Sequence, residues 1–556
     1  MSSREVNVID GALLKPLVVL SLPIVLSQML QVGYNLADTF WVGRVGQEAV
    51  SALSYSWPLV FLMISIAGGF TVAGTVLVSQ NKGAGRHEQV NFAAGQTIAF
   101  VAVVAGIFSV LGWILTPWLV DLIGARPGSL EYVLAVEYTR TIFLGVVFLF
   151  GFFIFQALLR GWGDTRTPLY LMAFGVVLNV LLDPFLILGF QGNVLLTGLG
   201  LEQLEASLFA LTGFEGYGVQ GAAIATVFSR GVGAIVGMYW LFAGKVGIHL
   251  SFSDLRLRFE MVRRIVSLGL PSSVEQSTRA LGITVLTALV ALASDDAVAA
   301  LGIGNRLNSL VFLPALGLAR GTETVVGQNL GTQQVARAKR AVGYSSVIVA
   351  SVLAVLSVVA YVFAEPITAA FIPGEPNVIA IGADYLTIIG PTFLFIGVFQ
   401  VVQGAFRGSG STRLAMIFAI LSLWVFRLPP AYVLLDWFGM GETGVWYAIA
   451  LSNVLSMLAA SLYFLRGTWT ETVIEPDDDG DDTGETVESE AASPDLPANP
   501  TDSPSTDSAH TDSAHTDSAH TDSAHTDSAS EASSVDPADS PEADSEPDSE
   551  HPEKSG

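Results

Sequence analysis

The chain has 556 residues, of which 51% are hydrophobic and 14% are charged, and its mean hydropathy is +0.56. This composition excludes an ordinary soluble domain and indicates a membrane protein with many spans. The formal net charge of −24 belongs to the tail, because residues 467–556 hold 26 acidic residues and one lysine, whereas residues 1–466 hold 24 acidic and 25 basic residues. This acidity carries no argument for nucleic acid, which we do not expect as a partner. The absence of cysteine excludes disulfides, thiolate metal sites and cysteine nucleophiles.

The amino-terminal residues 1–16 lack a basic segment followed by a cleavable apolar core, so we expect no removable signal peptide. A helix needs about 20 apolar residues to cross a bilayer. The stretches that meet this length are 13–41, 49–79, 91–116, 131–159, 167–190, 217–243, 264–293, 297–329, 341–364, 378–406, 413–435 and 443–465. The predicted fold class is therefore an all-α integral membrane protein with twelve transmembrane helices. Several stretches exceed the required length, which predicts tilt or extra turns outside the bilayer.

Basic residues lie mainly in the loops on one side of this topology. These loops carry Lys82, Arg86, Arg160, Arg166, Lys245, Arg256, Arg258, Arg263, Arg264, Arg337, Lys339, Arg340, Arg407 and Arg413. The opposite loops carry only Arg44 and Arg126, among many acidic residues. By the positive-inside rule we expect both termini to be cytoplasmic, in a multi-pass protein of the cell (plasma) membrane. The longest loop on the outer side is 191–216.

Three motifs occur twice at a nearly constant spacing. They are Pro23…Gln28 with Pro271…Gln276, VSQNKGAGRHEQV at 78–90 with VGQNLGTQQVARA at 326–338, and LRGWGDTR at 159–166 with FRGSGSTR at 406–413. The offsets are 248, 248 and 247 residues. Collinear repeats of this kind predict two six-helix bundles in the same orientation, related by an internal parallel repeat. The substrate path is then expected at their interface or within the bundles.

This repeat divides the chain into four expected segments. They are an amino-terminal six-helix lobe at 1–243, a cytoplasmic inter-lobe linker at 244–263, a carboxy-terminal six-helix lobe at 264–466 and a disordered acidic cytoplasmic tail at 467–556. The composition of the tail does not allow it to bury a core. Its AHTDS pentads place histidines at His510, His515, His520 and His525. A metal-binding role for them is less favoured than solvated low-complexity sequence, because ligands on a floppy chain are not preorganised.

Asn179 and Asp183 interrupt the apolar span 167–190 with two polar side chains four residues apart. This spacing places both on one face of a helix. A carboxylate at membrane depth costs at least about 2.5–3.5 kcal/mol, so its presence indicates a functional site. Pro184 follows directly and weakens the helical hydrogen bonding, which would open backbone carbonyls to a bound cation.

Gln31, Tyr34 and Asp38 form a second polar stripe, at helical spacing in the first span. If the first, fifth and sixth spans adjoin, the carboxylates of Asp38 and Asp183 converge. Two nearby carboxylates resist simultaneous ionisation, so such a pair holds a proton or binds sodium through hard oxygen ligands. An organic cation competes for the same charge and also finds the aromatic face of Tyr34 and the thioether of Met172.

A structural interpretation of these residues stays open. Asp38 and Asp183 would then be buried acids paired with Arg140 or Arg230, which are the only plausible basic partners in the nearby spans. Asn179 would act as a hydrogen bond between helices. The scarcity of bases favours the functional interpretation of the two acids.

Several motifs follow one another in a recognisable order. They are P-I-V-x-x-Q and Y-N-L-A-D-T-F-W-V-G-R-V-G within 23–46, V-S-Q-N-x-G-A-G after the second span, R-G-x-G-D-T-R after the fourth, N-x-x-x-D in the fifth and G-A-A-I-A-T at 221–226. Together they resemble the multidrug and toxic compound extrusion (MATE) family over about residues 11–466, and most closely its archaeal and DinF-like branch. The sodium-coupled NorM-type branch has an acid deeper in the seventh span, whereas RALGITVL around position 280 contains none after Glu275.

The resemblance implies roles for individual residues. The residues that match the family's amino-lobe cation or proton site, including any sodium site, are Asp38, Asn179, Asp183 and Thr226. The residues that fall where family members line the drug cavity are Gln31, Tyr34, Gln156 and Met172. Pro23 matches the proline at which the first helix bends. Packing of a Gly/Ala-rich helix face explains Thr226 equally well.

Two oppositely charged pairs lie at helical spacing in the second half, Glu275 with Arg279 and Arg320 with Glu323. We interpret them as self-neutralising pairs, with Glu275 as the best alternative candidate for a functional acid. Arg306 and Arg427 have no obvious partner. Arg427 lies near the repeat equivalent of the Asn179 region, where no acid occurs, so ion coupling is predicted for the first half.

These features predict a secondary active antiporter that exports organic cations, drugs or toxic compounds in exchange for protons or sodium ions by alternating access. The alternative within the same superfamily is a flippase for lipid-linked saccharides, which needs a larger and more cationic cavity. A passive channel also stays open, whereas an enzyme is not expected, since no GxxxxGK[ST], Ser/His/Asp arrangement or HExxH is present. We expect no cofactor, a small cationic amphipathic substrate and a monomer in the lipid bilayer.

Overall fold

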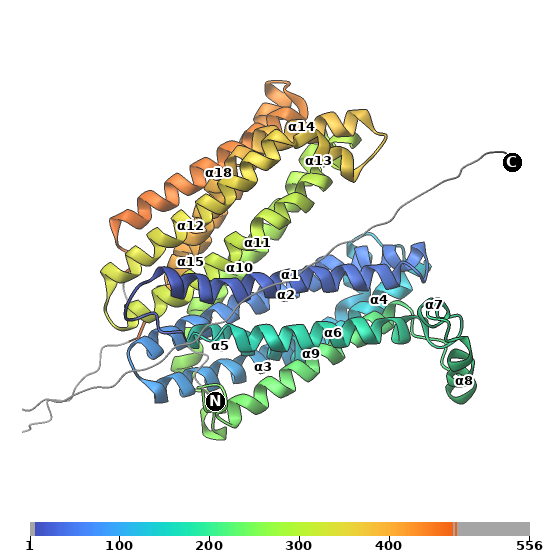
Figure 1. Ribbon diagram of the computed structural model, residues 1–556, viewed down its shortest axis with the longest axis horizontal. Coiled ribbons are helices and arrows are strands. Elements are labelled where there is room, and N and C mark those ends of the chain that lie inside the picture. Colours follow the sequence, from blue (N-terminus) through green and yellow to red (C-terminus); the bar gives the residue numbers. More distant parts are fainter. Residues whose placement is uncertain (1–5, 471–472, 475–556) are drawn as a thin grey trace, which may run out of the picture. The chain divides into compact units, whose positions relative to one another are not determined.

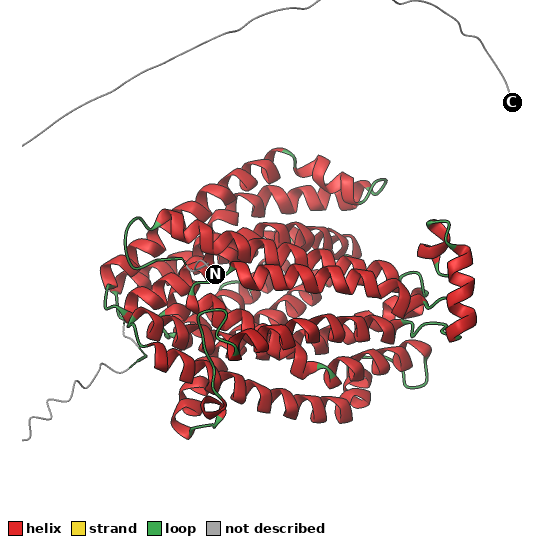
Figure 2. Cartoon of the chain, turned by 60° about the horizontal axis from the view of Figure 1, so that its bottom comes forward, coloured by secondary structure: helices red, strands yellow, loops and turns green. Residues whose placement is uncertain are grey.

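The computed structural model describes residues 6–470 and 473–474, with the side chain of Leu310 excepted. This part of the chain is helical and contains no strand (Figure 2). The helices of the first half are α1 (Leu14–Val42), α2 (Gln47–Gly83), α3 (His87–Leu122), α4 (Leu130–Leu144), α5 (Val146–Trp162), α6 (Arg166–Leu188), α7 (Val194–Gly198), α8 (Glu202–Thr212) and α9 (Val219–Phe242).

The second half begins after a short 3₁₀ turn, η1 (Phe252–Leu255). Its helices are α10 (Phe259–Ala291), α11 (Asp295–Gly331), α12 (Val335–Val362), α13 (Ala364–Phe371), α14 (Pro376–Ile389), α15 (Phe393–Gly408), α16 (Thr412–Ile420), α17 (Leu428–Tyr432) and α18 (Gly441–Arg466). A 3₁₀ turn, η2 (Gly390–Thr392), joins α14 to α15, and π-helical segments, η3 (Leu421–Val425) and η4 (Val433–Trp437), flank α17.

Ten helices or helix runs in the described chain are long and apolar enough to cross a membrane, and the pair α4 and α5, bent by 53°, makes an eleventh. Gly145 lies at this bend against Val227 of α9, where a Cβ would overlap the valine side chain. The 33-residue α10 is not among these spans, and it carries Glu275 and Arg279. The predicted all-α membrane fold is confirmed, and the count of twelve spans is approximate.

Each half buries a hydrophobic core of its own. The first core includes Phe150 and Leu158 of α5, and the second includes Phe406 of α15 and Trp446 of α18. In Figure 1 the blue-to-green helices α1–α9 form one group, and α10–α18, coloured green-yellow to orange, form another. We refer to these two groups as the first and second lobes.

The lobes contact each other near the helix ends that carry the basic loops, which we term the basic end. Gln80 Nε2 of α2 donates to the Gly408 carbonyl at 3.2 Å, and Gln328 Nε2 of α11 donates to the Gly161 carbonyl at 2.9 Å. The two glutamines are 248 residues apart and the two glycines 247 residues apart. Each repeated Q-N motif therefore binds the repeated R-G-x-G turn of the other lobe, which confirms the predicted internal repeat.

Close backbone approach accompanies these reciprocal bonds. A Cβ at Gly83 would overlap the carbonyl oxygen of Gln328, and a Cβ at Gly331 would overlap the carbonyl oxygen of Gln80. These two glycines are also 248 residues apart. Glycine is required at both places because the helix backbones of the two lobes touch there.

The ends of the described chain also pack at the basic end. The Val6 amide donates to the Gly163 carbonyl at 3.4 Å, and the Val473 amide donates to Gln80 Oε1 at 2.9 Å. Trp469 is fully buried beside Phe464. The expected tail at 467–556 thus begins with residues that contact the helices, while residues 471–472 and 475–556 lie outside the described chain.

We predict that Gln80→Ala loosens the contact between the lobes, because it leaves the Gly408 carbonyl and the Val473 amide without partners at about 1–3 kcal/mol for each buried group. Since the chain has no cysteine, Ser79→Cys, at a buried position against Gly327, provides a single reporter. Labelling of Cys by a water-soluble maleimide should accelerate several-fold in the Gln80→Ala background.

Gln96→Ala is the matched control, because Gln96 is equally buried but binds the linker, where it donates to the carbonyls of Asp254 and Arg256 and accepts from the amide of Arg258. It should leave the labelling rate unchanged. Equal acceleration by both variants would contradict a specific role for Gln80.

Candidate functional site

The polar pair of α6 lies in the interior of the first lobe. Asn179 and Asp183 are both fully buried, and Asn179 Nδ2 donates to Asp183 Oδ1 at 3.3 Å. Helix α6 continues through Pro184 to Leu188, and the Pro184 carbonyl accepts a hydrogen bond from Asn193 at 2.9 Å. The helical spacing thus brings the two side chains together as predicted.

Helices α1 and α9 add further oxygen atoms beside this pair, because α6 packs against both. Tyr34 Oη and Thr226 Oγ1 are 2.6 Å apart, and Thr226 Oγ1 donates to Asp38 Oδ2 at 3.5 Å. Asp38 and Asp183 lie on helices α1 and α6, which pack against each other. The first, fifth and sixth predicted spans therefore converge on one cluster of side chains.

Three buried acceptor atoms in this cluster have no hydrogen-bond donor among the described residues. They are Asp38 Oδ1, Asn179 Oδ1 and Asp183 Oδ2. Buried acceptors normally have partners, so an unmatched group of them indicates a missing proton or cation. Hard oxygen atoms of this kind suit sodium, and the two carboxyl groups suit a shared proton. No group of three or more His, Cys, Asp or Glu side chains in the described chain is arranged to hold a metal ion.

Arg230 of α9 is a further member of the cluster. Its guanidinium donates to Gln31 Oε1 and, at 2.9 Å, to Met172 Sδ, and it lies 5.2 Å from the ring centroid of Tyr34. Among the described residues it forms no ion pair with either acid, although its charge acts on Asp38. From the sequence we expected Arg230 only as a partner for an acid. Its position one helical turn after Thr226, however, places both side chains on the same face of α9.

The remaining predicted residues are less closely joined to the cluster. Gln156 of α5 is half-buried, and no hydrogen bond connects it to the cluster in the described chain. Pro23 lies inside the continuous helix α1, and its carbonyl accepts a hydrogen bond from Ser27 at 2.9 Å. Arg140, the other base considered as a partner, donates instead to the Trp113 carbonyl at 3.2 Å.

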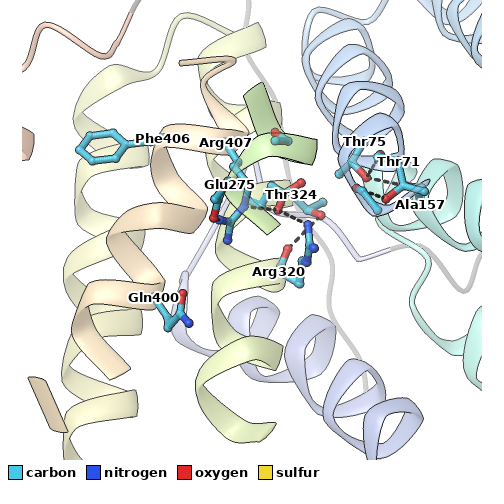
Figure 3. Close-up of polar contacts among 12 residues, drawn as sticks. Thr71, Thr75, Ala157, Glu275, Arg320, Thr324, Gln400, Phe406 and Arg407 are labelled. Atoms are coloured by element: carbon cyan, nitrogen blue, oxygen red, sulfur yellow. Dashed lines mark hydrogen bonds and ion pairs between the residues drawn. The ribbon is translucent and has the colours of Figure 1, made fainter. Parts of the chain in front are cut away.

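The second lobe holds a buried ionic network (Figure 3). The predicted pairs are confirmed, with Arg279 at 3.9 Å from Glu275 and Arg320 at 3.1 Å from Glu323. Arg407 lies between them and pairs with Glu275 at 2.7 Å and with Glu323 at 3.4 Å. From the sequence we expected Arg407 in a basic loop. In the structure Arg407 belongs to the last turn of α15, and its side chain is only 6% exposed. Side chains in a helix point back toward its amino terminus, so the Arg407 side chain lies inside the lobe rather than in the loop that follows.

Comparison with known proteins gives a family match in both halves. The MatE family model matches residues 23–185 and 271–433. The probable multidrug resistance protein YpnP of Bacillus subtilis is 30% identical over 465 residues, which cover 83% of this chain and 96% of that protein. The probable multidrug resistance protein NorM of Thermotoga maritima is 26% identical over 460 residues, covering 83% and 94%. The outward-facing structure of a multidrug resistance MATE family transporter of the MOP superfamily aligns with a TM-score of 0.74 and 24% identity, covering 84% of this chain and 98% of that one.

The charge balance of the buried network predicts that neutralising different members lowers the folding stability by different amounts. Three guanidinium groups face two carboxylates, so Arg407→Gln removes the excess charge, whereas Glu323→Gln enlarges it. We expect Glu323→Gln to cost about 3–5 kcal/mol of folding free energy and Arg407→Gln about 1–3 kcal/mol. Thermal unfolding of the purified variants in detergent shows which of the two substitutions is more destabilising.

Adding Arg320→Gln to Glu323→Gln should recover part of the lost stability, because it removes the arginine left unpaired. Arg413→Gln, at an exposed position of the same lobe, serves as the neutral control. Equal losses for the two single variants, or no recovery in the double variant, would show that charge balance does not govern this network.

Proposed function

The chain belongs to the MatE family of multidrug and toxic compound extrusion transporters and is a multidrug transporter rather than an enzyme; we propose that it works as an antiporter at the Asp38, Asn179 and Asp183 cluster. In this proposal, protons or sodium ions enter the cluster as organic compounds leave. The supporting observation is the group of three buried oxygen atoms without donors in the first lobe. A positive charge satisfies these atoms, and only one such charge is accommodated at a time.

The proposed substrate is a small, cationic, amphipathic molecule, for which the cluster offers charge and apolar surface. The guanidinium of Arg230 already lies over the rings of Tyr34 and Phe152 and touches the Met172 sulfur. These are the surfaces that an organic cation would use. Arg230 is therefore an internal competitor, which must move away when a cationic substrate binds.

The arrangement of the chain in the membrane follows from the same proposal. The single-sided basic loops support cytoplasmic termini in the plasma membrane, with the basic end facing the cytoplasm. Lobes at 1–243 and 264–466, joined by the linker at 244–263, would then rock against each other around the contact at the basic end, as one monomer. The reciprocal Gln80 and Gln328 bonds support a closed cytoplasmic side.

A flippase for lipid-linked saccharides is the second candidate function. The observation in its favour is the excess of arginine in the second lobe, which suits a pyrophosphate group. The two acids of the first lobe argue against it, because they would repel that anion.

We predict that Asp38→Asn and Asp183→Asn each abolish gradient-driven efflux, since one carboxylate no longer exchanges a cation against the drug. Dye efflux from proteoliposomes, with a pH gradient and a sodium gradient imposed separately, measures the effect and identifies the coupling ion. Each variant should unfold within a few degrees of the unmodified protein, because asparagine preserves the shape of the side chain.

Asp121→Asn is the matched control at an exposed aspartate of α3 and should transport normally. Full transport by both Asp38→Asn and Asp183→Asn would refute the assignment of the exchange site.

A further inference from the structure

The interior of the second lobe holds more positive than negative charge. Among the described residues, the four guanidinium groups of Arg279, Arg320, Arg407 and Arg427 accompany two carboxylates, those of Glu275 and Glu323. Charged groups inside a membrane protein are costly unless they are paired or serve a function. The first lobe has the opposite balance, with two acids beside Arg230. The excess in the second lobe therefore requires an explanation.

Arg427 has hydrogen-bond partners but no counter-ion in the described chain. Its Nε donates to Ser452 Oγ at 2.8 Å, and its Nη2 donates to Asn453 Oδ1 at 2.7 Å. Asn453 is itself held by a bond from its Nδ2 to Thr392 Oγ1 at 2.9 Å. These neutral partners orient the guanidinium without neutralising it.

The backbone around Arg427 departs from regular helix on both sides. The π-helical segments η3 and η4 flank the short helix α17, which begins directly after Arg427 and contains Pro429 and Pro430. Prolines remove helical hydrogen bonds, and π-helical turns occur frequently at functional sites. The local structure therefore matches a residue placed for binding.

Arg279 is the second guanidinium with incomplete compensation. Its nearest acid, Glu275, lies 3.9 Å away and is bound more closely by Arg407. Arg279 Nη2 donates to Gln400 Oε1 at 3.3 Å, which fixes the orientation of the Gln400 amide. Gln400 is only 2% exposed, and its Nε2 is left without an acceptor among the described residues. A buried donor without an acceptor indicates an absent partner with lone pairs.

These donors belong to one region of the lobe. Gly282, one turn after Arg279, packs so closely on Leu423, one turn before Arg427, that a Cβ at Gly282 would lie 3.0 Å from a Leu423 methyl group. Helix α10, which carries Arg279, also packs against α17, which begins directly after Arg427. In the described chain, this region of the lobe therefore holds a guanidinium without a counter-ion at Arg427, a guanidinium that shares its acid with Arg407 at Arg279, and the unsatisfied amide N–H of Gln400.

The repeat makes this region the counterpart of the acidic cluster. Arg279 is 248 residues after Gln31, and Arg427 is 247 residues after Val180, the neighbour of Asn179. Both arginines thus align with uncharged residues that lie near the acids of the first lobe, and no arginine replaces an acid position by position. The positive charges of Arg279 and Arg427 argue against a second cation site in this region of the second lobe.

We propose that Arg279, Arg427 and the Gln400 amide form an oxyanion site, which binds the carboxylate or phosphate group of a transported molecule. Guanidinium groups bind such oxyanions through paired N–H donors, and the Gln400 N–H₂ supplies another donor. The inference rests on the proposed transport function and extends its substrates from simple cations to amphoteric molecules, which carry both charges. A substrate without an anionic group does not use this site.

A matched pair of dyes tests the site. Rhodamine 19 carries a free carboxylate, and rhodamine 6G is its ethyl ester, so the two differ only at the group in question. Fluorescence anisotropy with the purified full chain in detergent measures both dissociation constants without any ion gradient. We expect Arg279→Gln and Arg427→Gln to weaken rhodamine 19 binding at least tenfold and to change rhodamine 6G binding less than twofold.

Gln400→Glu provides a nearly isosteric second variant, which places a carboxylate of the protein itself in the site. It should weaken rhodamine 19 binding as strongly as the arginine variants, even if those variants fold poorly. Arg140→Gln is the control, because this arginine lies in the first lobe beside Trp113. Equal weakening of both dyes, or no change with Gln400→Glu, would overturn the oxyanion site.

Nanodiscs distinguish a substrate group from a lipid headgroup as the source of the oxyanion. If phosphatidylglycerol in place of phosphatidylcholine weakens rhodamine 19 binding to the unmodified chain but not to Arg427→Gln, the site holds and its resident anion is the headgroup of an anionic lipid. If lipid has no effect and inorganic phosphate competes, the site holds for a soluble substrate. Failure of gradient-driven efflux with retained selective dye binding would refute antiport while leaving this site intact.

Discussion

The cost of an uncompensated charge in an apolar medium governs the interior of this protein. In the second lobe that cost is reduced by an open chain of ion pairs, in which Arg407 joins Glu275 and Glu323 while Arg279 and Arg320 pair at the two ends. In the first lobe, Asp38 Oδ1 and Asp183 Oδ2 have no hydrogen-bond partner among the described residues. Since buried pairs are stable only when both members are present, the second-lobe network is suited to a structural role, and the first-lobe acids are suited to exchange.

Arg230 modifies this picture, because it brings a permanent positive charge next to the acids without pairing with them. Its guanidinium binds neutral groups of Gln31 and Met172 and faces the aromatic ring of Tyr34. In the second lobe the guanidinium of Arg427 likewise binds neutral groups, the side chains of Ser452 and Asn453. Both arginines are thus oriented by neutral partners and have no carboxylate partner among the described residues.

The contact between the lobes depends on a different interaction, hydrogen bonding from buried amides to backbone carbonyls. Gln80 and Gln328 make this bond in opposite directions at equivalent places. Such bonds contribute about 0.5–1.5 kcal/mol each and are reversible, whereas ion pairs would resist separation at a dry interface. Further hydrogen bonds of the same kind join Ser273 to the Ile66 carbonyl and Thr324 to the Arg160 carbonyl. A contact that relies on neutral hydrogen bonds and close glycine packing is compatible with lobes that separate during transport.

The sequence by itself determined the membrane fold, the repeat and the pairing of Asn179 with Asp183, because hydropathy, motif offsets and helical spacing are local properties. It also identified the Glu275–Arg279 and Arg320–Glu323 pairs for the same reason. Only the tertiary structure decided that Arg407 joins these pairs, that Arg230 avoids the acids, and that Gln80 and Gln328 bind the opposite lobe. These contacts join residues that are far apart in the chain, and their partners depend on how the helices pack, which spacing along one helix does not specify.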